Sequence, residues 1–191
     1  MTRRSHTTEG KRGARHDGRL ILVIGGASSG KSEAALNLAA KGLARGATRA
    51  FVATGQARDE EMTVKIQRHR ASRGAGWETS EVPTDLLAWF QKHGRFYRAI
   101  VVDCLTLWLS NLRERGIRDA RILSLLTELL QAMRSSLARV VVVSNELGLG
   151  LVPMDVAARR FRDLAGQVNQ QVAAEADEVH FVVAGRPFRI K

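Results

Sequence analysis

Apolar positions along this chain follow two periodicities, one typical of buried strands and one of amphipathic helices. Short, continuous apolar runs predict strands at residues 20–24, 47–54, 98–103 and 139–144. The last run, RVVVVS, is apolar at four successive positions. Such a run is expected of a strand that helices cover on both faces of its sheet.

Helices are predicted between these strands, where apolar residues recur every three or four positions. The predicted helices span residues 33–43, 59–73, 83–92, 105–112, 122–137 and 155–175, and the charged segment 59–73 has the pattern of a surface helix. Residues 178–183 and 187–191 predict a closing antiparallel hairpin. This order predicts an α/β fold of three layers around a mostly parallel sheet.

Length and composition indicate one domain. With 191 residues, 45% of them hydrophobic, the chain can bury a full core. We expect that domain to span residues 19–191, after a basic and disordered tail at residues 1–18. No apolar run approaches the roughly 20 residues that cross a bilayer, so a soluble, cytoplasmic protein is expected. A single cysteine, Cys104, excludes an internal disulfide and is expected to be a small buried hydrophobe.

The formal net charge of +11 raises the question of nucleic-acid binding. Residues 1–18 contribute +3 of this charge, and the remainder of the chain keeps +8. Aromatic residues make up only 5% of the chain, which argues against a platform that stacks bases. Anionic small molecules explain the charge equally well, and no nucleic-acid partner is predicted.

The segment RLILVIGGASSGKS joins a predicted strand to a glycine loop and a helix, and it fits the GxxxxGK[ST] spacing of a phosphate loop. Glycines let backbone N–H groups approach a phosphate, and the helix start adds its positive dipole end. Lys31 is expected to reach the β- and γ-phosphates, and Ser32 to bind Mg²⁺. The predicted nucleotide-binding residues of the loop are Gly25, Gly26, Ala27, Ser28, Ser29, Gly30, Lys31 and Ser32.

Asp103 ends an apolar strand, so it is a candidate for a second phosphate-handling element. Its carboxylate can hold Mg²⁺ opposite Ser32, directly or through water. Asp is also favoured as the N-cap of a helix, which would make it a structural residue for the helix at 105–112. We favour the metal or nucleotide role, because this strand end is expected to lie beside the phosphate loop.

The basic segment KIQRHRASR, residues 65–73, contains His69. Such a segment is more often a solvated helix face than a site. However, the neighbouring arginines Arg68, Arg70 and Arg73 disfavour the protonated imidazole and attract a triphosphate. A neutral imidazole can attack phosphorus, so His69 is a candidate nucleophile.

Several blocks of the chain, in order, resemble one enzyme family: GGASSGKS, ATGQARDEEM, IQRHR, WETSEVP, DCLTLWLSN, VSNELGLGLVP, RRFRDLAGQVNQ and ADEV. Together they look like the bifunctional adenosylcobinamide kinase/adenosylcobinamide-phosphate guanylyltransferases of cobalamin biosynthesis, over residues 20–191. The resemblance implies phosphorylation of adenosylcobinamide by ATP or GTP. It also implies transfer of GMP from GTP to adenosylcobinamide phosphate, which releases pyrophosphate.

The resemblance also implies site residues. His69 matches the histidine that carries GMP, and Lys31 of the phosphate loop is the other predicted catalytic residue. The matched nucleotide-binding residues outside that loop are Thr54, Gly55, Gln56, Arg70, Ala71, Ser72, Arg73, Glu81 and Asp103. The segment SNELGLG, residues 144–150, is expected at the rim of the site. Relatives form homotrimers, which implies the same assembly here.

This chain departs from the family pattern at two positions: Ser28 stands where relatives often carry arginine, and Arg68 where some have a second histidine. The remaining histidines, His93 and His180 among them, match no family site and are predicted at the surface. Two other functions stay open. One is a plain small-molecule kinase that uses Lys31, Ser32 and Asp103, and the other is a nucleic-acid-binding ATPase.

Overall fold

In the computed structural model of this chain, residues 18–57, 60, 64, 74 and 76–191 are described. The predicted basic tail lies almost entirely outside these residues. So does most of the predicted helix at 59–73, including the candidate nucleophile His69. The description that follows concerns the predicted domain from its first strand onward.

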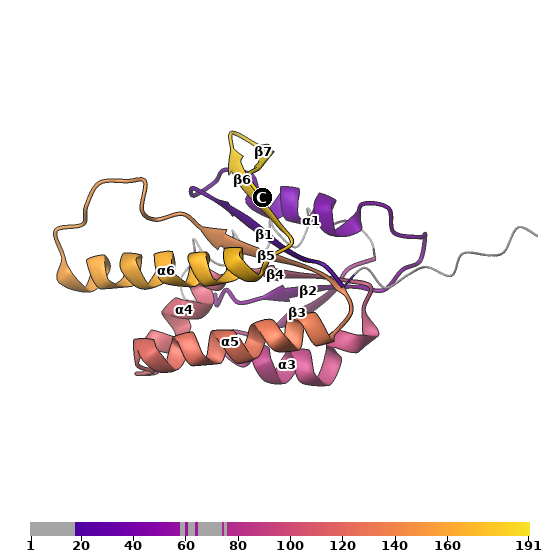
Figure 1. Ribbon diagram of the computed structural model, residues 1–191, viewed down its shortest axis with the longest axis horizontal. Helices are drawn as coiled ribbons and strands as arrows, with labels where there is room; N and C mark the ends of the chain where they lie inside the picture. Colours follow the sequence, from indigo (N-terminus) through magenta and orange to yellow (C-terminus); the bar gives the residue numbers. More distant parts are fainter. Residues whose placement is uncertain (1–17, 58–59, 61–63, 65–73, 75) are drawn as a thin grey trace, which may run out of the picture.

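The described strands form one seven-stranded sheet in the order β3-β2-β4-β5-β1-β6-β7 (Figure 1). All pairs are parallel except β6 with β7, which form the predicted antiparallel hairpin at the end of the chain. The strands are β1 (Leu20–Gly25), β2 (Arg49–Ala53), β3 (Glu78–Glu81), β4 (Ala99–Asp103), β5 (Arg139–Asn145), β6 (Glu178–Val183) and β7 (Arg186–Arg189). The mostly parallel α/β sheet is therefore confirmed.

Helices cover both faces of the sheet and create two separate cores. The described helices are α1 (Lys31–Ala40), α3 (Leu86–His93), the 3-10 helix η1 (Gly94–Phe96), α4 (Leu105–Glu114), α5 (Asp119–Ser135) and α6 (Val156–Glu175). Figure 1 shows α3, α5 and α6 beneath the sheet and α1 above it. Leu20 and Leu22 of β1 pack into the core below, whereas Ile21 and Val23 pack against α1. Because successive strand residues point to opposite faces, both cores need apolar side chains, which explains the continuous apolar runs.

Strand β3 was not expected from the sequence, so the strand predicted at 98–103 is the fourth in chain order and not the third. Its sequence, ETSE, has no apolar residue, and three of its four side chains are exposed. β3 lies at the edge of the sheet and is held by backbone pairing with β2.

Helix α1 also differs from its prediction, since it spans 31–40 and not 33–43. It begins directly after Gly30, at φ +91°, and Gly42, at φ +73°, follows its end.

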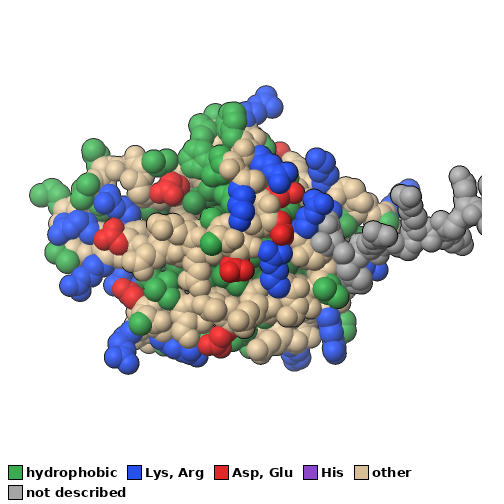
Figure 2. Space-filling view, viewed as in Figure 1, with side chains coloured by type: hydrophobic (Ala, Val, Ile, Leu, Met, Phe, Trp, Pro, Cys, Tyr) green, Lys and Arg blue, Asp and Glu red, His purple; other side chains and the backbone are tan. Residues whose placement is uncertain are grey.

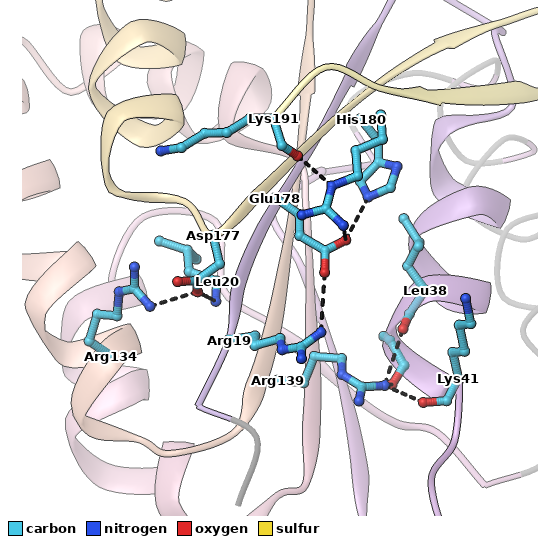
Figure 3. Close-up of polar contacts among 12 residues, drawn as sticks. Arg19, Leu20, Leu38, Lys41, Arg134, Arg139, Asp177, Glu178, His180 and Lys191 are labelled. Carbon is cyan, nitrogen blue, oxygen red and sulfur yellow. Dashed lines mark hydrogen bonds and ion pairs between the residues drawn. The ribbon is translucent and has the colours of Figure 1, made fainter.

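A cluster of charged side chains joins the last two strands to the start of β1 (Figure 3). Glu178 accepts one hydrogen bond from Arg19 at 3.2 Å, and its carboxylate contacts Nε2 of His180 at 3.0 Å. One residue earlier, the Asp177 carboxylate accepts from the backbone N–H of Leu20 at 2.8 Å and from the Arg134 guanidinium at 2.7 Å. The prediction that His180 is a surface residue is wrong, because only 8% of it is exposed.

This cluster predicts a loss of stability in acid. The hydrogen bond from His180 lowers the pKa of Glu178, and the charges of Arg189 and Arg19 add to it. Burial raises the pKa of Asp177, but the hydrogen bonds from Leu20 and Arg134 outweigh it and the net shift is downward. Both carboxyls therefore stabilise the fold above their ordinary pKa values of 4.5 and 3.8, and this contribution is lost as the pH falls through the lowered values.

Urea unfolding between pH 6.5 and 3 measures this effect. We expect the free energy of unfolding to fall less steeply with acid in Glu178→Gln than in the unmodified chain. Glu175→Gln, at the exposed end of α6, is the matched control and should keep the original slope. If Glu178→Gln retains that slope as well, the cluster does not couple stability to pH.

Among the described residues, no helix is both long enough and apolar enough to span a membrane.

Candidate active site

Most of the predicted site residues lie at one edge of the sheet, where the carboxyl ends of the parallel strands meet. The pairing register aligns Glu81 with Ala53, and Ala53 with Asp103. On the other side of the sheet centre, Gly25 is aligned with Asn145. Ligands of open α/β sheets bind at this edge, so these residues define the candidate site.

The phosphate loop runs from the end of β1 into the start of α1. Ser28 and Gly30 have positive φ values of 54° and 91°, which curl the backbone between the strand and the helix. Lys31 is the first residue of α1, only 8% of it is exposed, and its ammonium donates to the carbonyl of Gly26 across the loop. The helix N-terminus and the lysine therefore concentrate positive charge at the loop, as phosphate binding requires.

The C-terminal hairpin supports this loop from outside. The backbone N–H of Gly185 donates to the carbonyl of Ser29 at 2.8 Å. A Cβ on Gly30 would lie 2.9 Å from the Cα of Gly185, and a Cβ on Gly25 only 2.4 Å from the carbonyl oxygen of Val182. Both glycines of the motif are thus required by packing against β6 and the hairpin turn, in addition to any approach of phosphate.

Asp103 ends β4 and is half-buried, but its strand is not the neighbour of β1. β5 lies between them, so two strand spacings, roughly 10 Å, separate the two strand ends. The alternative role as a helix cap is not supported: Cys104 is the N-cap of α4, and no side chain caps that helix.

A buried hydrogen-bond network holds the ends of β2 and β4 together. The Thr54 hydroxyl accepts from the backbone N–H of Cys104 at 2.8 Å and donates to its carbonyl at 2.7 Å. Asn111 of α4 donates to the carbonyls of Thr54 and Pro83 at 2.8 and 2.9 Å. Thr54 is fully buried, so its contacts position the strand ends next to Asp103.

Cys104 is a buried apolar residue, as predicted. Burial and, to a lesser extent, the neighbouring Asp103 charge raise the pKa of its thiol to about 12. The thiol therefore stays protonated at neutral pH and is not a nucleophile.

A second network lies behind the segment 144–150. Thr106 accepts from the backbone N–H of Asn145 at 2.9 Å, and Asn169 of α6 donates to the Asn145 carbonyl at 3.1 Å. The backbone N–H of Glu146 donates to the Gly25 carbonyl at 2.9 Å, which ties this segment to the phosphate loop. The positioning roles of Thr106, Asn111 and Asn169 were not predicted. The sequence feature that could have indicated these roles is a small polar residue on an otherwise apolar face of a helix.

The structure does not bring all predicted residues together. Glu81 lies at the edge strand β3, four strand spacings from β1, or about 19 Å. Gly55 and Gln56 follow β2, the strand between β3 and β4, and both residues are half-buried. Five predicted residues, His69, Arg70, Ala71, Ser72 and Arg73, lie outside the described residues.

The donor set at this edge fits Mg²⁺. The described part of the chain contains no group of three or more His, Cys, Asp or Glu residues that could enclose a metal by itself. Ser32 and Asp103 instead offer a hydroxyl and a carboxylate, which are hard oxygen ligands. Mg²⁺ is commonly held by one or two such protein ligands together with substrate phosphates and waters.

Known proteins resemble this chain over nearly its whole length. Residues 21–190 match the family model described as cobinamide kinase / cobinamide phosphate guanyltransferase. The bifunctional adenosylcobalamin biosynthesis protein CobP of Pseudomonas aeruginosa is 41% identical over 177 residues, which cover 89% of this chain and 96% of that protein. CobU of Salmonella typhimurium, with the same descriptive name, is 38% identical over 192 residues, 90% of this chain and 99% of that protein.

Among solved structures, a KaiC-like protein of Pyrococcus horikoshii aligns with 86% of this chain and 71% of its own, at 14% identity and a TM-score of 0.49. The extent of the family match, together with a phosphate loop at the carboxyl edge of a parallel sheet, leads to one conclusion. This chain belongs to the cobinamide kinase/cobinamide phosphate guanyltransferase family.

Proposed function

We propose that this enzyme phosphorylates adenosylcobinamide with ATP or GTP and then transfers GMP from GTP to adenosylcobinamide phosphate. The product is adenosylcobinamide-GDP, and pyrophosphate is released. The observation that carries the proposal is the phosphate loop, with Lys31 buried at its mouth and the N-terminus of α1 behind it. The names of the relatives, which are adenosylcobalamin biosynthesis proteins, support the substrate.

In the kinase step, the loop amides and Lys31 hold the triphosphate and stabilise negative charge as the γ-phosphoryl group moves to the substrate hydroxyl. Ser32 and Asp103 would hold Mg²⁺, which neutralises charge on the phosphate oxygens when it is bound. The contacts of Thr54 with Cys104 keep the end of β4 in place, so that the Asp103 carboxylate needs no rearrangement.

In the guanylyl step, a neutral nitrogen of His69 attacks the α-phosphorus of GTP. A nitrogen–phosphorus bond forms, the bond to the bridging oxygen breaks, and pyrophosphate leaves with its electron pair. A phosphate oxygen of adenosylcobinamide phosphate then attacks the same phosphorus and displaces the imidazole. We assign Gly55, Gln56, Glu81 and residues 70–73 to holding the guanine nucleotide in this step.

In this proposal the basic side chains bind anionic small-molecule substrates, and nucleic acid is not a substrate. On the face seen in Figure 2, Lys and Arg side chains are scattered among acidic ones and form no single basic stripe.

We also propose a cytoplasmic homotrimer. The exposed apolar side chains of Leu149, Leu151 and Met154 support a subunit contact at the segment between β5 and α6.

Labelling with GTP that carries a radioactive α-phosphate tests the proposal. Purified protein with Mg²⁺ should take up label that is stable in alkali and labile in acid, as a phosphoramidate is, and His69→Asn should take up none. His93→Asn, which removes an imidazole on α3, is the matched control and should label fully. A chain that phosphorylates adenosylcobinamide but never labels would be a plain kinase, and equal labelling of His69→Asn would disprove the histidine mechanism.

A further inference from the structure

Asn145 ends β5, the strand that lies between the phosphate loop and Asp103. Figure 1 shows β5 between β1 and β4, with α1 above the sheet. The register places Asn145 beside Gly25, the last residue of β1, and two residues beyond the level of Asp103 on β4. Each of these two strands is about 4.8 Å from β5. Asn145 therefore lies midway between the two parts of the proposed site.

The side chain of Asn145 points to the face of the sheet that α1 covers. Val141 and Val143 of the same strand pack into the core under α1, and alternation along the strand gives Asn145 the same direction. Asp103 comes two positions after Val101, which packs into that core as well, so its carboxylate is also on this face. Helix α1 packs against both β4 and β5 and begins at the phosphate loop. The loop, the Asp103 carboxylate and the Asn145 amide therefore share one edge and one face of the sheet.

The backbone of Asn145 is fixed by two side chains, whereas its own amide has only a weak partner. Thr106 accepts from the backbone N–H, and Asn169 donates to the carbonyl. Among the residues that the structure describes, the one hydrogen-bond contact of the amide runs from Nδ2 to Sγ of Cys104, at 3.9 Å. Sulfur is a weak acceptor, and Asn145 is only half-buried. The amide can therefore exchange this contact for a stronger one with a ligand.

The proposed function puts a phosphate group next to this amide. Ser32 and Asp103 are the proposed ligands of one Mg²⁺, and in such sites the metal also binds oxygens of the β- and γ-phosphates. The γ-phosphate must then lie between the phosphate loop and the end of β4, which is where β5 ends. An amide N–H forms a stronger hydrogen bond with a charged phosphate oxygen than with a thiol.

We propose that the Asn145 amide binds the γ-phosphoryl group and stabilises it during the kinase step. This inference rests on the proposed function, because it adds a residue to the same site. In that step the bond between the γ-phosphorus and the bridging oxygen breaks, and the nucleoside diphosphate leaves with the electron pair. The substrate hydroxyl forms the new bond to phosphorus and loses its proton to water, while Nδ2 donates to a γ-phosphate oxygen. In the GMP transfer the γ-phosphate leaves unchanged within pyrophosphate, so there the contact contributes only to the binding of GTP.

Equilibrium binding of ATP and ADP to the full chain with Mg²⁺ tests this inference, because only ATP has a γ-phosphate. Asn145→Leu keeps most of the side-chain size, and Asn145→Ala removes it. Both variants lose the amide, so ATP should bind about tenfold more weakly to each, and ADP should keep its original affinity. Unchanged ADP binding also shows that a variant is folded with an intact loop.

Gln167→Ala, which removes an exposed amide on α6, is the matched control and should alter neither affinity. If both Asn145 variants bind ATP as the unmodified chain does, or lose ATP and ADP equally, the contact with the γ-phosphate is disproved.

The rates of the two reactions give a second measurement. In both Asn145 variants the kinase turnover at saturating ATP should fall about tenfold or more. Uptake of label from α-labelled GTP, at saturating GTP, should stay within about twofold of the original rate. Equal loss of both reactions would show that Asn145 only shapes the loop, and a normal kinase rate in both variants would contradict its role alone. An unmodified chain that neither binds ATP nor phosphorylates adenosylcobinamide would contradict the proposed function itself.

Discussion

Lys31→Ala is expected to reduce both the kinase reaction and the GMP transfer by about 100-fold or more. The ammonium is the one side-chain cation of the phosphate loop, and both reactions build negative charge on a triphosphate held there. Removing a single donor of this kind from an enzyme site costs about 10²–10³ in rate. Single-turnover measurements of each reaction, with ATP for the first and GTP for the second, give the two rates separately.

Packing must be separated from charge in this experiment, because Lys31 is buried and contacts the Gly26 carbonyl. Lys31→Met keeps most of the side-chain volume and removes the charge, so it should be as inactive as Lys31→Ala. Lys92→Ala, on the exposed side of α3, controls for the general loss of a positive charge. Should one of the two reactions continue at its original rate in Lys31→Met, the loop would serve only the other.

Most strands and helices could be predicted in their order from the sequence, because both cores require apolar side chains at regular positions. Val140 to Val143 are buried in alternation against opposite helix layers, so every position is apolar and the strand is evident. β3 was missed for the opposite reason. Its place at the sheet edge depends on backbone hydrogen bonds to β2, and backbone pairing leaves no apolar pattern in the residues 78–81.

The candidate site was predictable only where its residues are close in sequence. The loop residues 25–32 follow one another, so their spacing identifies them. The supporting contacts come from Val182 and Gly185, more than 150 positions away, and no local pattern indicates them. The same applies to His180, which is buried by its contact with Glu178 and by neighbouring strands. Strand order is likewise absent from periodicity, which explains why β5 was not expected between Asp103 and the phosphate loop.

Gly25→Ala is expected to destabilise the fold by about 2 kcal/mol and to abolish nucleotide binding. The new Cβ would lie 2.4 Å from the carbonyl oxygen of Val182 and 3.0 Å from the Ser29 hydroxyl. The first of these is backbone of the adjacent strand, which cannot rotate away as a side chain can. Overpacking of this kind typically costs 1–3 kcal/mol because β1 or β6 must shift. Urea unfolding measures the free energy of unfolding, and equilibrium binding of ATP shows whether the loop still binds a nucleotide.

Gly26→Ala provides the matched control one residue further along the same loop. A Cβ on Gly26 meets nothing within 4 Å, so this variant should unfold within about 0.5 kcal/mol of the original chain. The pair separates two reasons for a glycine in a phosphate loop. If Gly25→Ala is as stable as Gly26→Ala and only its ATP binding is lost, then Gly25 serves the approach of phosphate alone. A parallel loss of stability and binding in Gly25→Ala alone shows instead that β6 holds the loop in shape.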